Sequence, residues 1–256
     1  MLQSLYSAVT AVKSQQASID TIANNLANAN TEGFKKTRID FKDALYERML
    51  SPVDNSPQMN LQRGHGAVIS QSKRVFDQGA FQETGRMLDF AIEGDGFFEV
   101  QLSDGGTAYT RDGNFSFSIE ETGNFLVNSA GNYVLGEDGR ISVPDGLTGF
   151  SIEENGSIVF SIGEESISGG RIALSSFPNR TGLLKISGNN YVPSANSGEP
   201  VPAEDAAVTQ GRLEMSNVSM AEEMTRMIRS QRAFQLASRA ISITDQMAGT
   251  ANSIRA

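Results

Sequence analysis

The chain has 256 residues and a formal net charge of −9, and it contains one histidine, no cysteine and no tryptophan. Its length allows one large domain or two modest ones with a sizeable core. The lack of cysteine excludes zinc–thiolate sites, disulfides and cysteine nucleophiles, and His65 lies between two glycines, where a flexible loop would not orient a catalytic base.

The charge is unevenly distributed along the chain. Residues 76–212 carry a net charge of −13, whereas residues 1–75 carry +3 and residues 213–256 carry +1. An acidic body repels phosphate groups, so we expect a well-solvated surface and no nucleic-acid partner.

Neither a membrane span nor a cleaved signal peptide is expected. No apolar run approaches the ~20 residues that span a bilayer. Residues 1–7 lack the basic start and the continuous apolar stretch of a signal peptide. If the protein leaves the cytoplasm, we expect export without signal cleavage.

Residues 3–28 have the pattern of an amphipathic helix. Alternating steps of four and three residues connect Leu5, Val9, Val12, Gln16, Ile19, Ala23 and Leu26. This spacing keeps one seam on one side of a helix, as packing against another helix requires. The segment 30–33 contains Asn30 and Gly33, which tolerate the left-handed backbone found at helix ends.

Amide side chains are frequent in this helix. Asn24 and Asn28 are one turn apart and offer hydrogen bonds to a neighbouring surface; a frayed, solvated helix end is the alternative. Gln16, and Gln231 near the other end of the chain, fall in the seams. A seam amide can fix the register of packed helices, with a partly exposed amide as the alternative.

The segment 31–76 is expected to connect the helix to the rest of the chain. Residues 34–49 allow a short helix through Phe41, Ala44, Leu45 and Met49. Prolines, asparagines and glycines in residues 52–66 predict an exposed extended loop.

From residue 68 to residue 192 the sequence favours antiparallel strands. Asp-Gly or Asn-Gly pairs recur there, and these dipeptides supply the positive φ angles of tight hairpins. The strands expected include 97–101, 115–119 and 157–160, and apolar–polar alternation in 115–119 indicates a half-buried strand. Residues 193–211 are expected to form a loop, and we place the β domain at residues 77–212.

The second amphipathic pattern starts near residue 214 and runs almost to the end, with Ser216 or Asn217 as the expected cap. Met220, Met224, Met227, Gln231, Phe234, Ser238 and Ile241 repeat the alternating spacing. The expected fold is therefore α+β: long N- and C-terminal helices that pair as a coiled coil, with an inserted antiparallel all-β domain. Residues 1–30 and 214–256 would form the polymerisation domain.

The first helix is too weak to stand alone. Burying its six large apolar side chains contributes roughly 1.5–3 kcal/mol each. Ordering its backbone costs about 1–2 kcal/mol per residue. It needs the second helix and, we infer, copies of the same chain. The expected assembly interface comprises Leu5, Val9, Val12, Gln16, Ile19, Ile22, Asn24, Asn25, Leu26, Asn28, Met220, Met224, Met227, Gln231, Phe234 and Ile241.

Catalytic and ligand sites are not indicated. Carboxylate clusters such as Glu93, Asp95 and Glu99 leave a secreted glycosidase as an alternative, although most border turns. No calcium-loop pattern or dinucleotide fingerprint occurs, so we expect no catalytic residue, cofactor or metal. A secreted adhesin-like binding protein is the other alternative.

Three stretches resemble the rod and hook family of bacterial flagellar axial proteins. They are Ile22–Lys35 (IANNLANANTEGFK), the pair Asp89–Phe98 (DFAIEGDGFF) and Tyr109–Phe115 (YTRDGNF), and a C-terminal group containing Ser216–Val218 (SNV), Gln231–Phe234 (QRAF) and Asp245–Met247 (DQM). Within the family, the length and residues 52–66 are most similar to distal rod subunits, with proximal rod and shortened hook-type subunits as alternatives.

The resemblance implies a structural subunit of the flagellar basal body. Such subunits pass through the flagellar type III export apparatus and stack helically into the rod, the drive shaft that transmits motor torque to the hook. The partners implied are copies of the chain, other rod and hook subunits and the surrounding basal-body rings. The resemblance places the terminal helices in the inner tube and the β domain in the outer wall.

Overall fold

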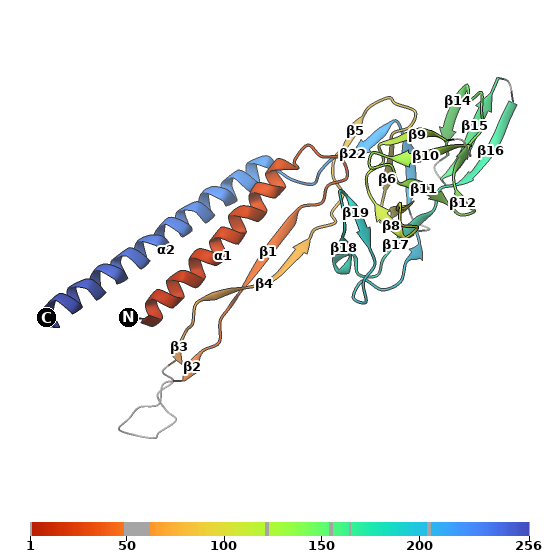
Figure 1. The fold of residues 1–256 in the computed structure, drawn as a ribbon. Coiled ribbons are helices and arrows are strands. Elements are labelled where there is room, and N and C mark those ends of the chain that lie inside the picture. The colour runs from red at the N-terminus through yellow and green to blue at the C-terminus, as the bar shows by residue number, and fades with distance from the viewer. Residues whose placement is uncertain are drawn as a thin grey trace. The chain divides into compact units, whose positions relative to one another are not determined.

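The computed structural model describes residues 2–48, 62–120, 123–153, 156–163, 165–203 and 206–255. The fold is α+β, with a helix at each end of the chain and a large antiparallel β region between them (Figure 1). The chain divides into two compact units. The helical unit comprises residues 1–27, 37–74 and 219–256, and the β unit comprises residues 28–36 and 75–218.

The helical unit contains two helices and a long two-stranded ribbon. Its elements are α1 (Leu2–Ala27), β1 (Thr37–Asp43), β2 (Glu47–Arg48), β3 (Gln62–Arg63), β4 (Ala67–Arg74) and α2 (Met220–Arg255). β1 pairs antiparallel with β4, and β2 with β3. The two helices lie side by side, and the ribbon contacts α1 (Figure 1). The predicted helix over residues 3–28 is confirmed.

The short helix allowed for residues 34–49 is wrong, because β1 and β2 occupy this segment. In Thr37–Lys42 (TRIDFK), β-branched and aromatic residues alternate with charged ones. That period of two suits a strand, and pairing with β4 satisfies the backbone groups on one edge of it.

Most of the loop expected at residues 52–66 lies outside the described residues, which resume at residue 62. Within the described part, His65 is half-buried. Its Nδ1 lies 2.9 Å from the carbonyl oxygen of Leu45, and its Nε2 lies 3.3 Å from Nε2 of Gln3. The expectation that nothing orients His65 is therefore wrong.

The β unit is built around an antiparallel sheet that has eleven strands within the described residues. The main path is β13 (Ser142–Val143), β10 (Gly123–Asn128), β11 (Tyr133–Gly136), β7 (Phe97–Gln101), β8 (Thr107–Thr110), β19 (Asn190–Val192) and β18 (Leu184–Lys185). β9 (Phe115–Glu120) joins β10, β12 (Gly139–Arg140) joins β11, β17 (Leu174–Ser176) joins β7, and β20 (Val201–Pro202) joins β17.

Smaller sheets complete the β unit. One has three strands: β14 (Gly149–Ile152), β15 (Ser157–Ile162) and β16 (Glu165–Arg171). Two are strand pairs: β21 (Ala207–Gln210) with β6 (Phe90–Glu93), and β22 (Arg212–Glu214) with β5 (Phe81–Glu83). A 3-10 turn, η1, spans Arg180–Gly182. The strands expected at 97–101, 115–119 and 157–160 are confirmed.

The central strand β7 is buried on both faces of the sheet. Phe97 and Phe98 are both fully buried, because consecutive side chains of a strand point to opposite faces. Phe98 packs into the larger apolar cluster with Phe90 and Phe115, and Phe97 into a second cluster with Tyr191. β7 therefore separates two cores.

The half-buried character expected of residues 115–119 holds only at their start. Phe115 is fully buried and Phe117 partly exposed, but Ile119 is 85% exposed. Alternation correctly identified the strand, yet the far end of β9 extends beyond the core. Ile119 thus gives the β unit an exposed apolar side chain.

The C-terminal part of the β unit differs from the expectation. The loop predicted at 193–211 contains β20 and β21, and β22 occupies the expected start of the second helix. The helix begins at Met220, so the caps predicted at Ser216 and Asn217 are wrong. Strand pairing with β5 and β6 outweighs the polar, proline-containing composition that indicated a loop.

The two units also differ in charge. The helical unit carries 12 basic and 8 acidic residues, a net charge of +4, and the β unit carries 9 and 22, a net charge of −13. The connecting segment expected at 31–76 is distributed between the two units, because the ribbon joins the helices while residues 28–36 join the β unit. No helix in the described part of the chain has the length and apolar character needed to cross a membrane.

Candidate assembly surface and buried polar network

The contact between α1 and α2 combines large apolar side chains with small and polar ones. The hydroxyl oxygens of Ser18 and Ser230 are 3.2 Å apart across it. On α2, one set of buried or half-buried positions recurs in steps of four and three, with Arg226, Ala233 and Ser238 half-buried beside it: Glu223, Met227, Ser230, Phe234, Ala237, Ile241, Thr244 and Ala248. α2 therefore turns one regular row of side chains inward.

The solvent-facing half of the same helix carries apolar side chains that remain exposed. They are Met220, Met224, Ile228, Leu236, Ile243, Met247 and Ile254. Ile254 is 82% exposed and Leu236 is 66% exposed. Exposed apolar residues scattered singly need no explanation, but seven of them spread along the solvent-facing half of one helix form a candidate contact surface. We call these seven residues the outer α2 row.

The residues expected at the assembly interface fall into three groups in the structure. Ile22 and Asn25 are buried. Half-buried positions are Leu5, Val9, Val12, Ile19, Leu26, Asn28, Met227, Phe234 and Ile241. Exposed positions are Gln16, Asn24, Met220, Met224 and Gln231. Gln16 donates to Oδ1 of Asp20 at 2.9 Å on the exposed side of α1.

Asn25 is the amide that organises the helical unit. Its Oδ1 accepts from the backbone N–H of Thr37 at 2.9 Å, and its Nδ2 donates to the Thr37 carbonyl at 2.9 Å. The same Nδ2 lies 3.1 Å from Oε2 of the buried Glu223. Asn25 thereby joins α1, the start of β1 and the first turn of α2. Sequence reasoning emphasised Asn24 and Asn28 and missed this role.

A hollow of about 250 Å³ lies among α1, β1 and α2. Its lining includes the hydroxyl residues Ser18, Thr21 and Ser230 together with Arg38 and Arg229. Hydroxyl and guanidinium groups are donors suited to carboxylate or carbonyl acceptors. The hollow therefore suits an acidic or carbonyl-rich surface better than an apolar ligand.

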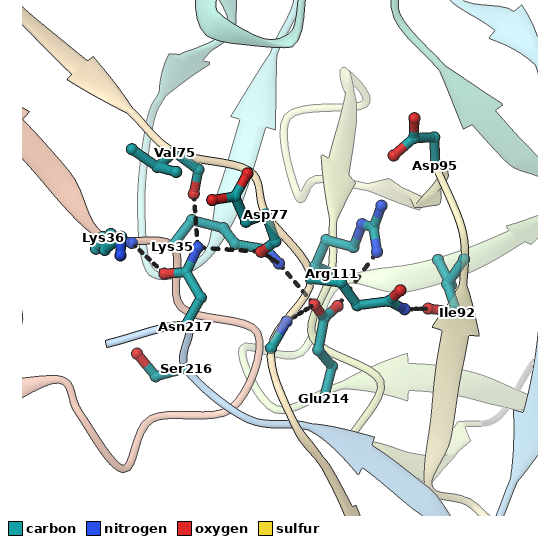
Figure 2. A network of polar contacts seen from close by, with 12 residues as sticks. Lys35, Lys36, Val75, Asp77, Ile92, Asp95, Arg111, Glu214, Ser216 and Asn217 are labelled. Atoms are coloured by element: carbon teal, nitrogen blue, oxygen red, sulfur yellow. Dashed lines mark hydrogen bonds and ion pairs between the residues drawn. The ribbon is translucent and has the colours of Figure 1, made fainter. Parts of the chain in front are cut away.

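The β unit encloses a network of buried charges centred on Glu214 (Figure 2). Its Oε1 accepts from Nζ of Lys35 at 2.6 Å and from the backbone N–H of Gly79 at 2.8 Å. Its Oε2 accepts from Nη1 of Arg111 at 3.3 Å. All three charged side chains are at most 2% exposed.

Backbone carbonyls complete the coordination of the two cations. Lys35 also donates to the carbonyl of Asp77 at 2.8 Å, and Nη2 of Arg111 donates to the carbonyl of Gly94 at 2.8 Å. Burial lowers the pKa of both Lys35 and Arg111, and the negative charge of Glu214 opposes that shift. One carboxylate thus faces two buried cations.

Asn217 extends the network to the segments that enter and leave the β unit. Its Oδ1 accepts from the backbone N–H of Lys36 at 2.8 Å. Its Nδ2 donates to the carbonyls of Val75 and Asp77 at 2.8 and 3.0 Å (Figure 2). This amide therefore satisfies backbone groups at residue 36 and at residues 75 and 77, and it is not available to cap α2, which is the physical reason for the wrong cap.

The network could not be derived from residue types alone. Lys35, Arg111 and Asn217 each lie in one of the stretches quoted for the family resemblance, but nothing in those stretches indicates that they meet. The available signal is local: Lys35 follows Phe34, and Glu214 stands between Leu213 and Met215. Within the described residues, no group of three acidic or histidine side chains is arranged to hold a metal ion.

Comparison with protein families gives three matches along the chain. Residues 5–35 match the flagella basal body rod protein family. Residues 91–160 match the D1 domain of the flagellar hook protein FlgE/F/G family, and residues 209–254 match the C-terminal region of the flagellar basal body rod FlgEFG proteins. The matched segments include both helices and the centre of the β unit.

Full-length relatives agree with these matches. The flagellar basal-body rod protein FlgG of Borreliella burgdorferi is 40% identical over 275 residues, which cover 100% of this chain and 99% of the relative. FlgG of Bacillus subtilis is 40% identical, with 96% of this chain and 97% of the relative covered. The flagellar hook-basal body complex protein FlhP of Bacillus subtilis is 33% identical, with complete coverage of both chains.

Proposed function

The chain belongs to the family of flagellar basal-body rod proteins, and we propose that its helical unit polymerises with copies of itself into the distal part of the rod. It is a structural subunit and not an enzyme. The secreted glycosidase and the adhesin are not favoured. As a rod protein it is part of the flagellum and assembles with other rod and hook subunits in the basal body.

The outer α2 row is the observation that carries the polymerisation proposal. Its seven apolar side chains remain exposed although α1 and the ribbon already pack in the same unit. A copy of the chain offers complementary helix faces, and a coiled-coil arrangement of α1 and α2 would extend across copies. A contact between two different surfaces of identical subunits does not close on itself and yields a helical filament.

Charge supports the placement of the two units in the filament. The helical unit, with its hollow lined by Arg38 and Arg229, suits an interior where carbonyl and carboxylate acceptors of neighbouring copies are dense. The strongly acidic β unit suits the outer wall, facing solvent and the surrounding basal-body rings. Export through the flagellar type III apparatus without a cleaved signal peptide belongs to the same proposal.

Polymerisation is tested by a charge placed in the outer α2 row. Ile243→Asp should abolish filament formation, because burying an unpaired carboxylate at a helix contact is strongly unfavourable. Ile119→Asp is the matched control, since Ile119 is an exposed isoleucine of the β unit. Sedimentation and electron microscopy of both variants give the result, and unchanged assembly of Ile243→Asp would refute the proposal.

We also propose that residues 52–66 brace neighbouring copies and stiffen the rod. This segment connects the two strands of the ribbon that packs on α1. Deleting it should reduce the bending stiffness of assembled rods, measured from their curvature in electron micrographs. Rods that assemble with unchanged stiffness after the deletion would contradict the proposal.

A further inference from the structure

Three segments that are far apart in the sequence meet at the carboxylate of Glu214. Lys35 is separated from it by 179 residues and Arg111 by 103 residues. Each of the three charged groups is buried within the β unit (Figure 2). The contact therefore joins the first, the middle and the last part of that unit.

The buried cluster around Glu214 contains one carboxylate and two cations. Within the described residues, Glu214 is the one carboxylate that forms an ion pair with Lys35 or Arg111. Nε of Arg111 is buried without a hydrogen-bond partner, and Nη2 is bound to the neutral carbonyl of Gly94, so neither atom has a second carboxylate in place of Glu214. Loss of Glu214 leaves two buried cations unpaired, whereas loss of Lys35 leaves a balanced Glu214–Arg111 pair.

The backbone around Glu214 docks both flanking segments at the same time. The N–H of Gly33 donates to the carbonyl of Glu214 at 2.8 Å, and the N–H of Met215 donates to the carbonyl of Ala80 at 2.9 Å. A Cβ at Gly79 would overlap the carbonyl oxygen of Met215. Glu32 has further partners in Asn114 and Asn189, but Gly33, Lys35, Gly79 and Ala80 all contact residues 214–215, so these contacts of residues 31–35 and 77–80 form only when residues 212–215 are in place.

We propose that Glu214 is a folding checkpoint: residues 31–35, 77–80 and 111–113 become fixed together, and only after the C-terminal segment of the β unit has docked. A chain that emerges N-terminus first keeps its N-terminal segment undocked until residue 214 arrives. This property follows from the contacts within the β unit and does not depend on polymerisation. It goes beyond the proposed function.

Equilibrium unfolding of four full-length variants tests the charge requirement. Glu214→Gln should raise the unfolding equilibrium constant of the β unit by about 100-fold or more, because it leaves two buried cations unpaired. Lys35→Met should have a much smaller effect. Lys35→Met combined with Glu214→Gln restores the wild-type net charge of the buried cluster and should recover most of the stability lost in Glu214→Gln. Glu83→Gln is the control, since Glu83 forms an exposed ion pair with Arg212.

The order of events is tested by pulse-labelled hydrogen exchange during refolding of the wild-type chain and of Glu214→Gln. Amides of residues 31–35, 77–80 and 111–113 should gain protection with one rate constant, together with residues 212–215. That shared phase should slow in Glu214→Gln. If Glu214→Gln does not fold, the double variant must still fold and show the shared phase.

Three results would overturn the proposal. The first is a loss of stability in Glu214→Gln that is no larger than the loss in Glu83→Gln. The second is a double variant that is no more stable than Glu214→Gln, and the third is protection of residues 31–35 and 111–113 before residues 212–215 become protected.

Discussion

The helical unit and the β unit differ in how much of their apolar surface they bury. The β unit encloses two aromatic clusters on either side of β7, and its buried charges are paired around Glu214. The helical unit fully buries few large side chains and leaves the outer α2 row exposed. We propose from this difference that the β unit is stable by itself, whereas the helical unit is completed by association with copies of the chain.

The largest effect is expected from removing an aromatic side chain of the β unit. Phe98→Ala should destabilise the unit by about 3–5 kcal/mol, since Phe98 is fully buried and packs edge-on against Phe115. Urea unfolding followed by tyrosine fluorescence measures the change. Leu236→Ala, at an exposed site of α2, should change the stability of the free chain by less than about 0.5 kcal/mol. Equal losses in the two variants would remove the contrast between the units.

A smaller effect is expected within the helical unit. Asn25→Ala should destabilise it by about 1–3 kcal/mol, because Thr37 and the buried Glu223 lose hydrogen-bond partners. Faster hydrogen exchange of the Thr37 amide would report the loss locally. Asn24→Ala, at the neighbouring exposed position, is the control and should leave that amide protected. A Thr37 amide that exchanges equally in both variants would contradict the role assigned to Asn25.

The pH dependence of stability sharpens the account of the buried charges. Burial lowers the pKa of Lys35 in the folded state below its ordinary value of 10.5. Between the lowered value and 10.5 the unfolded chain binds more protons than the folded one, so the Lys35 contribution makes the β unit more stable as pH rises. Below the folded-state pKa both states bind the proton, so the stability gained from Lys35 at higher pH is absent. The unfolding free energy should be measured for the wild type and for Lys35→Met across alkaline pH. The value for the wild type minus the value for Lys35→Met should rise with pH. A difference that does not change with pH would show that Lys35 titrates normally.

Much of the fold could be predicted because it depends on local patterns. Hydrophobic spacing identified α1 and most of α2, and Asp-Gly turns with alternating residues identified β7, β9 and β15. β22 was missed because it depends on pairing with β5, which lies about 130 residues earlier in the chain. The wrong cap at Asn217 has the same origin, since its amide is used by Lys36 and Val75.

The candidate surface was only partly predictable for a related reason. The sequence pattern followed the largest side chains of α2 and selected Met220 and Met224 of the outer α2 row, but it did not select Ile228, Leu236, Ile243, Met247 or Ile254. The inward row instead contains Glu223 and Ser230, whose positions depend on Asn25 and Ser18 of the other helix. Partners distant in sequence decided which polar residues became buried.

Hydrogen exchange of the free subunit and of assembled filaments tests most directly whether copies of the chain complete the helical unit. In the free subunit, amides of α2 should exchange rapidly while those of β7 are protected; on assembly, α2 should become protected and β7 should remain unchanged. A subunit that stays monomeric at high concentration with α2 already protected would contradict the account.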